Sequence, residues 1–235
     1  MLQLVTAHNG LHGQDMILRL KTVQRYHAIL EVNRAALSEP GLHEILGHTY
    51  SVVKELIPCD RMALSLYAPE VQALQLAAAA GQGPASFYQV GLMLDCKESH
   101  HGWVFEHKKP LVRRDLEEEM QFCIEQPNAM EGVRSYCAVP LIVREHSLGV
   151  MIALSSERNV YSEQHAEFLQ EVADQLTLAV KSLMPSCPQH PGSKLMCPRC
   201  IASRGGQATA GKHKMHLSEW GKKGGRGRRK GRPEA

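Results

Sequence analysis

Two long apolar segments separated by three residues constrain the fold of this chain more than any other feature. Residues 133–144 and 148–155 alternate along their length with a period of two, which is typical of β-strands. The connection Glu145-His146-Ser147 is short enough for the two strands to pair as an antiparallel hairpin. The sequence therefore predicts a sheet that contains this hairpin.

The other periodic segments predict helices near both ends of the chain and a second hairpin between them. Helical spacing covers residues 14–38, 42–57 and 162–184. Ser162 can cap the last of these helices. In the first helix, the apolar residues that recur on one face are Val23, Tyr26, Leu30 and Leu37. Residues 62–80 predict two strands joined at Ala68-Pro69-Glu70.

The segment between the two hairpins predicts smaller elements. Residues 81–96 predict a loop, 99–108 a short helix capped by Ser99, 109–112 an extended piece and 116–126 another helix. The whole order predicts an α+β fold in which helices from both chain ends cover an antiparallel sheet.

An acidic body is joined to a strongly basic C-terminal end. From Ser186 onward the chain has twelve Lys/Arg and two Asp/Glu, a net charge of +10, whereas the preceding residues have fifteen and twenty-two, a net charge of −7. The basic end is the part that would meet a polyanion. We divide the chain into an unstructured N-terminus (1–13), one folded domain (14–184), a cysteine-containing segment (185–203) and a basic low-complexity tail (204–235).

The sequence favours a reducing, cytoplasmic environment. No apolar run reaches the roughly 18 residues that a membrane-spanning helix needs, and the first residues lack the leading positive charge of a secretory signal. The odd number of cysteines, seven, argues for free thiols. The simplest interpretation of the four cysteines in the body is that they are small buried apolar side chains, namely Cys59, Cys96, Cys123 and Cys137.

The segment from Gly132 to Met151 resembles the GAF family, because Val139-Pro140-Leu141 precedes a tight connection and Leu148-Gly149-Val150 follows it. Cys59-Asp60-Arg61 and Phe168-Leu169 extend the resemblance to roughly 165 residues. It implies a six-stranded antiparallel sheet with a ligand pocket on one face, roofed by residues 81–130, and a homodimer formed through the first and last helices. Pro140 suits a sheet edge or bulge, and Gly149 suits a close approach of two backbones.

GAF domains differ in their ligands, which include cyclic nucleotides, bilins, haem and small metabolites. The residue set of the cyclic-nucleotide members is absent here, and no cysteine directly precedes His100-His101 as in bilin-binding members. Either histidine could in principle bind haem, although surface histidines at a helix start are the simpler interpretation. The resemblance gives Phe87, Trp103 and Tyr136 as candidate pocket residues, with ordinary core packing as the alternative.

One branch of the family reduces free methionine sulfoxide with a thiolate and a resolving cysteine. The segment of this chain that matches its cysteine-containing motif is residues 101–105, which contain no cysteine. Cys96 and Cys123 remain as redox candidates. The sequence therefore favours a protein that is not an enzyme, with a thiol-dependent reductase as the less favoured alternative.

The cysteine-containing segment has the spacing of a metal site. Cys187 and His190 are separated from Cys197 and Cys200 by six residues, and each pair has two residues between its members. Two such turns can place three thiolates and one imidazole around a tetrahedral Zn²⁺ ion. The alternative is a cluster without metal.

The basic tail indicates contact with DNA or RNA, because lysine and arginine displace counterions from phosphates. Residues 230–233, Lys-Gly-Arg-Pro, resemble the centre of an AT-hook. The candidate nucleic-acid-binding residues are Lys222, Lys223, Arg226, Arg228, Arg229, Lys230 and Arg232. The alternative is a solvated tail or one that docks on an acidic protein.

Together these features predict a ligand- or signal-sensing regulator that dimerises and contacts nucleic acid through its tail. The alternative is a protein-interaction adaptor that does not bind nucleic acid.

Overall fold

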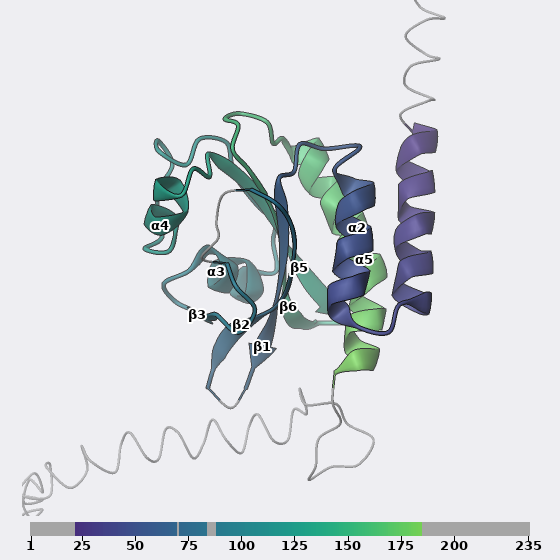
Figure 1. Ribbon diagram of the computed structural model, residues 1–235. Coiled ribbons are helices and arrows are strands. Elements are labelled where there is room, and N and C mark those ends of the chain that lie inside the picture. The colour runs from purple at the N-terminus through teal and green to yellow at the C-terminus, as the bar shows by residue number, and fades with distance from the viewer. Residues whose placement is uncertain (1–21, 70, 84–87, 185–235) are drawn as a thin grey trace, which may run out of the picture. The chain divides into compact units, whose positions relative to one another are not determined.

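The computed structural model describes residues 22–69, 71–83 and 88–184 (Figure 1). Phe87, the four candidate zinc ligands and the seven candidate nucleic-acid-binding residues lie outside the described residues. Among the described helices, none combines the length and the apolar character needed to cross a bilayer.

The centre of the fold is an antiparallel sheet of six strands, as the family resemblance implied, and the strand order is β3-β2-β1-β6-β5-β4. Its strands are β1 (Arg61–Ala68), β2 (Ala73–Gly81), β3 (Met93–Asp95), β4 (Leu111–Arg113), β5 (Ser135–Val143) and β6 (His146–Ser155). The sequence predicted a loop with little regular structure over residues 81–96. The structure differs near the end of this segment, where the short strand β3 pairs with β2.

The hairpin of β5 and β6 is confirmed, with Ser135 opposite Ser155 and Val143 opposite His146. The register of this pair shifts between Leu141 and Ile142, one residue after Pro140. A proline cannot donate to the ladder, so a position next to an irregularity suits it.

Helices lie on both faces of the sheet (Figure 1). The first helix (residues 22–38), α2 (Leu42–Val53) and α5 (Glu163–Leu183) lie on one side, where α2 packs on β1 and β2 and α5 packs mainly on β5. On the other side lie α3 (His100–His107) and α4 (Glu125–Met130), and α3 contacts β5 and β6. Because both faces are covered, β5 and β6 are buried over nearly their whole length.

The predicted helix over residues 116–126 was wrong. Leu116 is buried, but the segment after it forms turns, and the helix begins only at Glu125. The Glu125 carboxylate accepts the backbone N–H groups of Gln121 and Phe122 at 2.6 and 2.7 Å, so a side chain organises this segment. Pro127 lies in the first turn of this helix, where the missing N–H group costs no hydrogen bond.

The apolar stripe of the first helix faces outward. Val23, Tyr26 and Leu30 are 63–65% exposed and Leu37 is 83% exposed, whereas Ala28, Val32 and Ala35 are buried. At the start of α5, Ser162 occupies the N-cap position, but its side chain makes no capping hydrogen bond. The expected capping by Ser99 of α3 is confirmed, because Ser99 Oγ accepts the Gly102 N–H at 3.0 Å.

Gly149 lies where the β6 backbone closely approaches the β1 backbone, as expected. A Cβ atom at this position would lie 2.0 Å from the Ser65 carbonyl oxygen, which belongs to the backbone and cannot move aside. We expect Gly149→Ala to lower the free energy of unfolding by about 1–3 kcal/mol, as measured by urea denaturation.

Gly47 provides the matched control, because it is inside helix α2 and no atom of residues 22–69, 71–83 or 88–184 that would be in contact lies within 4 Å of a Cβ atom there. Gly47→Ala should raise the free energy of unfolding by up to about 1 kcal/mol. Equal effects of the two substitutions would contradict the close approach of β6 and β1.

Candidate functional site

The start of helix α3 directs two histidines into the interior. Ser99 Oγ caps the helix and also donates to the Asp95 carbonyl at 2.5 Å. A Cβ atom on Gly102 would lie 2.0 Å from the Cys96 carbonyl oxygen, so the helix packs tightly on the preceding turn. His100 and His101 are therefore fully buried. The expectation that they lie on the surface was wrong.

A buried polar network surrounds these histidines and consists of Ser65, Tyr88, His100, His101 and Asn128. The Tyr88 hydroxyl lies 2.9 Å from His100 Nε2 and 3.2 Å from His101 Nε2, and it accepts from Asn128 Nδ2 at 3.4 Å. His101 Nδ1 lies 2.9 Å from the Ser65 hydroxyl on β1. The network thus links strand β1, the segment before β3 and helices α3 and α4.

Two buried polar atoms of this network have no hydrogen-bond partner in the described part of the chain. They are His100 Nδ1 and Asn128 Oδ1. Because most buried polar groups in proteins are paired, such atoms require an explanation, and a bound molecule is one. The network is therefore the candidate functional site.

Both histidines are held neutral by their surroundings. Burial lowers the pKa of His101 to about 3. Burial is also the main reason that the pKa of His100 lies well below its usual value, and His101 and Arg113 lower it further. A neutral imidazole has one N–H donor and one lone-pair acceptor, so each ring can join two different partners.

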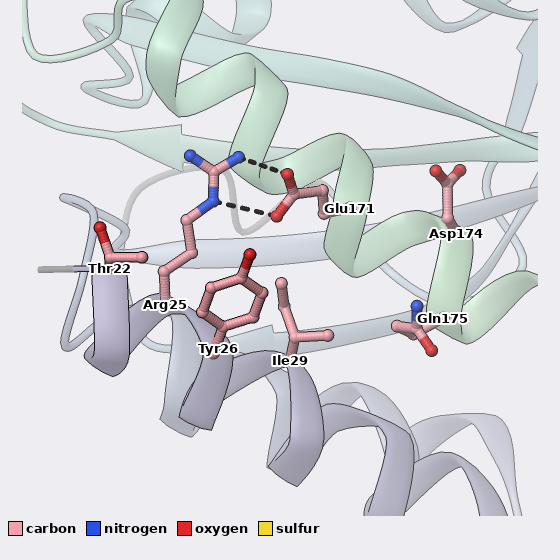
Figure 2. A pocket seen from close by; sticks show the side chains of 7 residues that line it. All are labelled: Thr22, Arg25, Tyr26, Ile29, Glu171, Asp174 and Gln175. Carbon is pink, nitrogen blue, oxygen red and sulfur yellow. Dashed lines mark hydrogen bonds and ion pairs between the residues drawn. The ribbon is translucent and has the colours of Figure 1, made fainter. Parts of the chain in front are cut away.

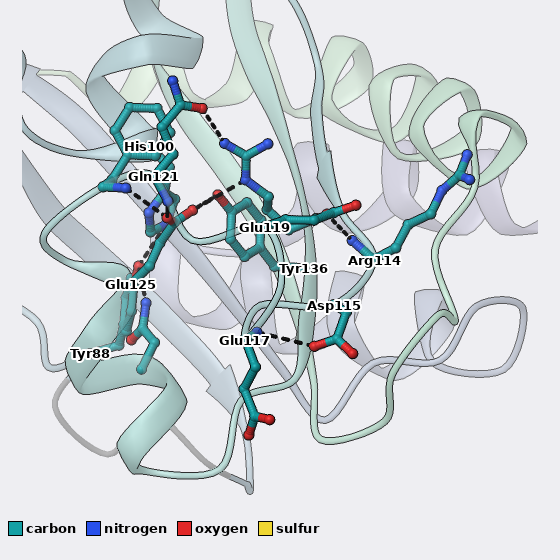
Figure 3. Close-up of polar contacts among 12 residues, drawn as sticks. Tyr88, His100, Arg114, Asp115, Glu117, Glu119, Gln121, Glu125 and Tyr136 are labelled. Carbon is teal, nitrogen blue, oxygen red and sulfur yellow. Dashed lines mark hydrogen bonds and ion pairs between the residues drawn. The ribbon is translucent and has the colours of Figure 1, made fainter.

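A second cluster is centred on Glu125 and adjoins the buried polar network (Figure 3). Besides the two backbone N–H groups, the carboxylate accepts the Tyr136 hydroxyl and lies 3.4 Å from Arg113 Nε. The Tyr136 ring stacks on His100 with 4.6 Å between ring centroids. Burial and the nearby carboxylate raise the pKa of Tyr136, so its hydroxyl remains a donor.

The structure places the three expected pocket residues differently. Tyr136 is fully buried in the Glu125 cluster. Trp103 is half-buried on α3, where it stacks on His107 at 4.4 Å, and Phe87 lies outside the described residues. Sequence reasoning did not identify Tyr88, Glu125 or Asn128 as site residues. For the two histidines, the sequence did contain a signal of burial at a helix start, because they directly follow a capping serine and precede a glycine.

A separate groove of 470 Å³ lies between the first helix and α5 (Figure 2). Arg25 crosses it and binds Glu171 through Nη2 at 2.6 Å and Nε at 2.9 Å. The lining residues are Thr22, Arg25, Tyr26, Ile29, Glu171, Asp174 and Gln175. The groove therefore adjoins the exposed apolar stripe of the first helix.

The thiols of the folded domain differ in exposure. Cys137 is buried, Cys59 and Cys96 are half-buried, and Cys123 is exposed. Burial raises the pKa of Cys59 and of Cys137 to about 12 and that of Cys96 to about 11. These three side chains are consequently thiols at neutral pH, whereas nucleophilic chemistry requires a thiolate.

The neutral histidines make stability depend on pH. Their pKa values are lower in the folded than in the unfolded protein, so the unfolded chain binds more protons below about pH 6.5. Above that pH, we expect these two histidines to cause no pH dependence of the free energy of unfolding. As the pH falls from about 6.5 toward 3, His101 should remove about 1.4 kcal/mol per pH unit, and His100 changes the stability in the same direction.

Urea denaturation of the wild type and of His101→Gln between pH 5 and 7.5 measures this dependence. Below about pH 6 the variant should lose stability less steeply, whereas above pH 7 the two proteins should differ by a constant amount. Parallel curves over the whole range would show that His101 is not held neutral.

Solved structures of several proteins share this fold. A GAF domain from a phosphoenolpyruvate-protein phosphotransferase of Coxiella burnetii has a TM-score of 0.59 at 19% identity, covering 68% of this chain and 94% of that chain. Free methionine-R-sulfoxide reductase from Neisseria meningitidis, in complex with its substrate, has a TM-score of 0.56 at 18% identity, covering 67% and 89%.

The GAF domain of a two-component sensor histidine kinase from Bacillus halodurans has a TM-score of 0.53 at 19% identity, covering 61% of this chain and 95% of that chain. Identities this low establish the fold alone. No curated protein sequence matches this chain.

The model of the GAF domain family matches residues 41–180, which is more than half of the chain. The chain therefore belongs to the GAF domain family.

Proposed function

We propose that this protein is a sensory GAF protein that binds a small molecule at the buried polar network beneath α3. One observation carries the proposal: His100 Nδ1 and Asn128 Oδ1 are buried without a partner among the residues that the structure describes, in a network whose other hydrogen bonds are made. A network that served packing alone would lose stability through these two atoms. A ligand that completes the network restores that loss.

We favour a regulatory role over an enzymatic one. A structural neighbour is a sulfoxide reductase, but burial keeps Cys59, Cys96 and Cys137 protonated. Residues 101–105, which match the cysteine-containing motif of the reductases, form part of α3 without a cysteine. The reductase remains the less favoured alternative, with Cys123 as its exposed thiol.

We propose that the protein forms a homodimer through the first helix and α5. The exposed residues Val23, Leu30 and Leu37 repeat every seven positions, and Tyr26 and Asn33 occupy the intermediate positions of the same repeat. This spacing is that of a helix–helix seam. The partner that we propose for this helix face is a second copy of the chain, which carries the same repeat.

Charge also favours a second copy as the partner. Glu167 and Asp174 are exposed on α5, whereas Arg34 is exposed on the first helix. Arg25 and Glu171 already pair with each other within one protomer. The first helix of one protomer would therefore meet an acidic α5 on its partner.

For the C-terminal region, we propose that Cys187, His190, Cys197 and Cys200 bind Zn²⁺ and that the basic tail contacts DNA or RNA. The support is the paired ligand spacing and the net charge of +10 from Ser186 onward. The alternative is an adaptor that uses the same region to dock on an acidic protein.

Native mass spectrometry of the full chain, purified from its own host, tests the folded domain and the zinc cluster together. We expect a dimer in which each chain carries one small molecule and one zinc ion. Leu30→Glu should convert the dimer to a monomer while the small molecule stays bound, because the substitution places a charge in the helix seam.

Val71→Glu is the matched control, since Val71 is 60% exposed and lies outside the helices. It should leave the dimer intact. A wild-type chain without a bound small molecule would contradict the sensory proposal, and a wild-type monomer would contradict the dimer proposal.

A gel-retardation assay tests the tail. The full chain should retard DNA or RNA at low salt, and retardation should weaken steeply as salt rises. Replacing the seven basic residues named above (222–232) by glutamine should abolish it, whereas Lys97→Gln, in the folded domain, should not. A full chain that fails to retard either polymer at low salt would instead support the adaptor.

A further inference from the structure

The hydrogen bonds of the buried polar network determine where its protons lie. The Ser65 hydroxyl donates to the Val150 carbonyl at 3.3 Å, and a hydroxyl has only one proton. Ser65 must therefore accept from His101 Nδ1, which lies 2.9 Å away. His101 then carries its proton on Nδ1 and has a lone pair on Nε2, because the ring is neutral.

The same argument continues through Tyr88. Its hydroxyl, 3.2 Å from His101 Nε2, donates its single proton to that lone pair. It then accepts from Asn128 Nδ2 at 3.4 Å and from His100 Nε2 at 2.9 Å. His100 therefore carries its proton on Nε2, and its Nδ1 has a lone pair. Asn128 likewise points its amide oxygen away from Tyr88.

The opposite direction of donation fits less well. If Ser65 donated to His101, His101 would donate to Tyr88, and Tyr88 would donate to His100. That arrangement gives up the hydrogen bond from Ser65 to the Val150 carbonyl, whereas the first arrangement makes all five contacts of the network. The geometry thus selects two vacant acceptors, namely His100 Nδ1 and Asn128 Oδ1.

From this arrangement we infer that the site takes an uncharged molecule that donates N–H hydrogen bonds, of the primary carboxamide or amino-heterocycle class. The inference rests on the proposed sensory function and names its ligand class. Anions are disfavoured because both vacant atoms present lone pairs. Cations are disfavoured because the neighbouring carboxylate, Glu125, is already bonded to Arg113, Tyr136 and two backbone N–H groups.

The aromatic surroundings define the direction of approach. The His100 ring stacks on Tyr136 with 4.6 Å between ring centroids, and the tilted rings of His101 and Phe122 lie 4.7 and 6.3 Å away. The vacant lone pair of Nδ1 lies in the plane of the imidazole ring, so a donor must approach His100 in that plane. A planar NH₂ group satisfies this geometry.

The tautomers can be observed without any ligand. Long-range ¹H–¹⁵N correlation spectra of the full chain at pH 7.5 should show His100 protonated on Nε2 and His101 protonated on Nδ1. The reverse tautomer on either ring would overturn the inference. The sensory proposal would survive, because it requires only that a small molecule is retained.

Four probes of similar shape test the ligand class. Benzamide is neutral and donates, N,N-dimethylbenzamide cannot donate, benzamidine is a cation and benzoate is an anion. At millimolar concentration, benzamide should shift the ¹⁵N resonance of His100 Nδ1 and bind at least tenfold more tightly than the other three. Preferential binding of another probe, or binding of none, would overturn the inference.

A pair of variants on α4 locates the binding. Asn128→Leu removes one vacant acceptor with little change of volume and should weaken benzamide binding at least tenfold. Gln126→Leu makes the same kind of change at an exposed position of the same helix and should leave binding unchanged. Equal affinities for the two variants would place the probe elsewhere. If Asn128→Leu does not fold, the wild-type tautomers and probe series still decide the question.

Discussion

The arrangement of the α3 face of the sheet depends on the buried carboxylate of Glu125. A buried charge is stable only when it is paired and fully hydrogen-bonded. Glu125 meets this condition by drawing in two backbone N–H groups, the Tyr136 hydroxyl and the Arg113 guanidinium. Because removing one partner of a buried pair costs about 3–5 kcal/mol, this cluster holds the segment between β4 and α4 over the sheet. It also fixes Tyr136, on which His100 stacks.

The sheet and its covering helices could be predicted because their signals are local. The alternation of β5 and β6 and the short connection between them determine a hairpin whatever lies elsewhere in the chain. The capping of α3 by Ser99 is equally local. The first helix shows the limit of this reasoning, since periodicity identified its apolar stripe but not which side of the helix faces the core. Small residues, Ala28 and Ala35, occupy the buried side.

The candidate site could not be predicted because its contacts join residues far apart in the sequence. Tyr88 and Asn128 are forty positions apart, and Ser65 and His101 are thirty-six apart. None of these residues is unusual in its local context. The helix start at Glu125 was missed for a related reason: its side chain bonds the backbone of the preceding turns, which periodicity does not detect.

Strand β5 connects the candidate site with the groove between the first helix and α5. Its Tyr136 faces the site, whereas the Pro140 carbonyl accepts from Gln170 on α5 at 3.1 Å. Gln170 also donates to Asp174 at 2.8 Å, and Asp174 lines the groove beside the first helix. A ligand can bias that groove only by binding one arrangement of β5 and α5 more tightly than another. A polar ligand that completed the His100 and Asn128 hydrogen bonds would supply such a difference, because both atoms are unpaired within the described part of the chain.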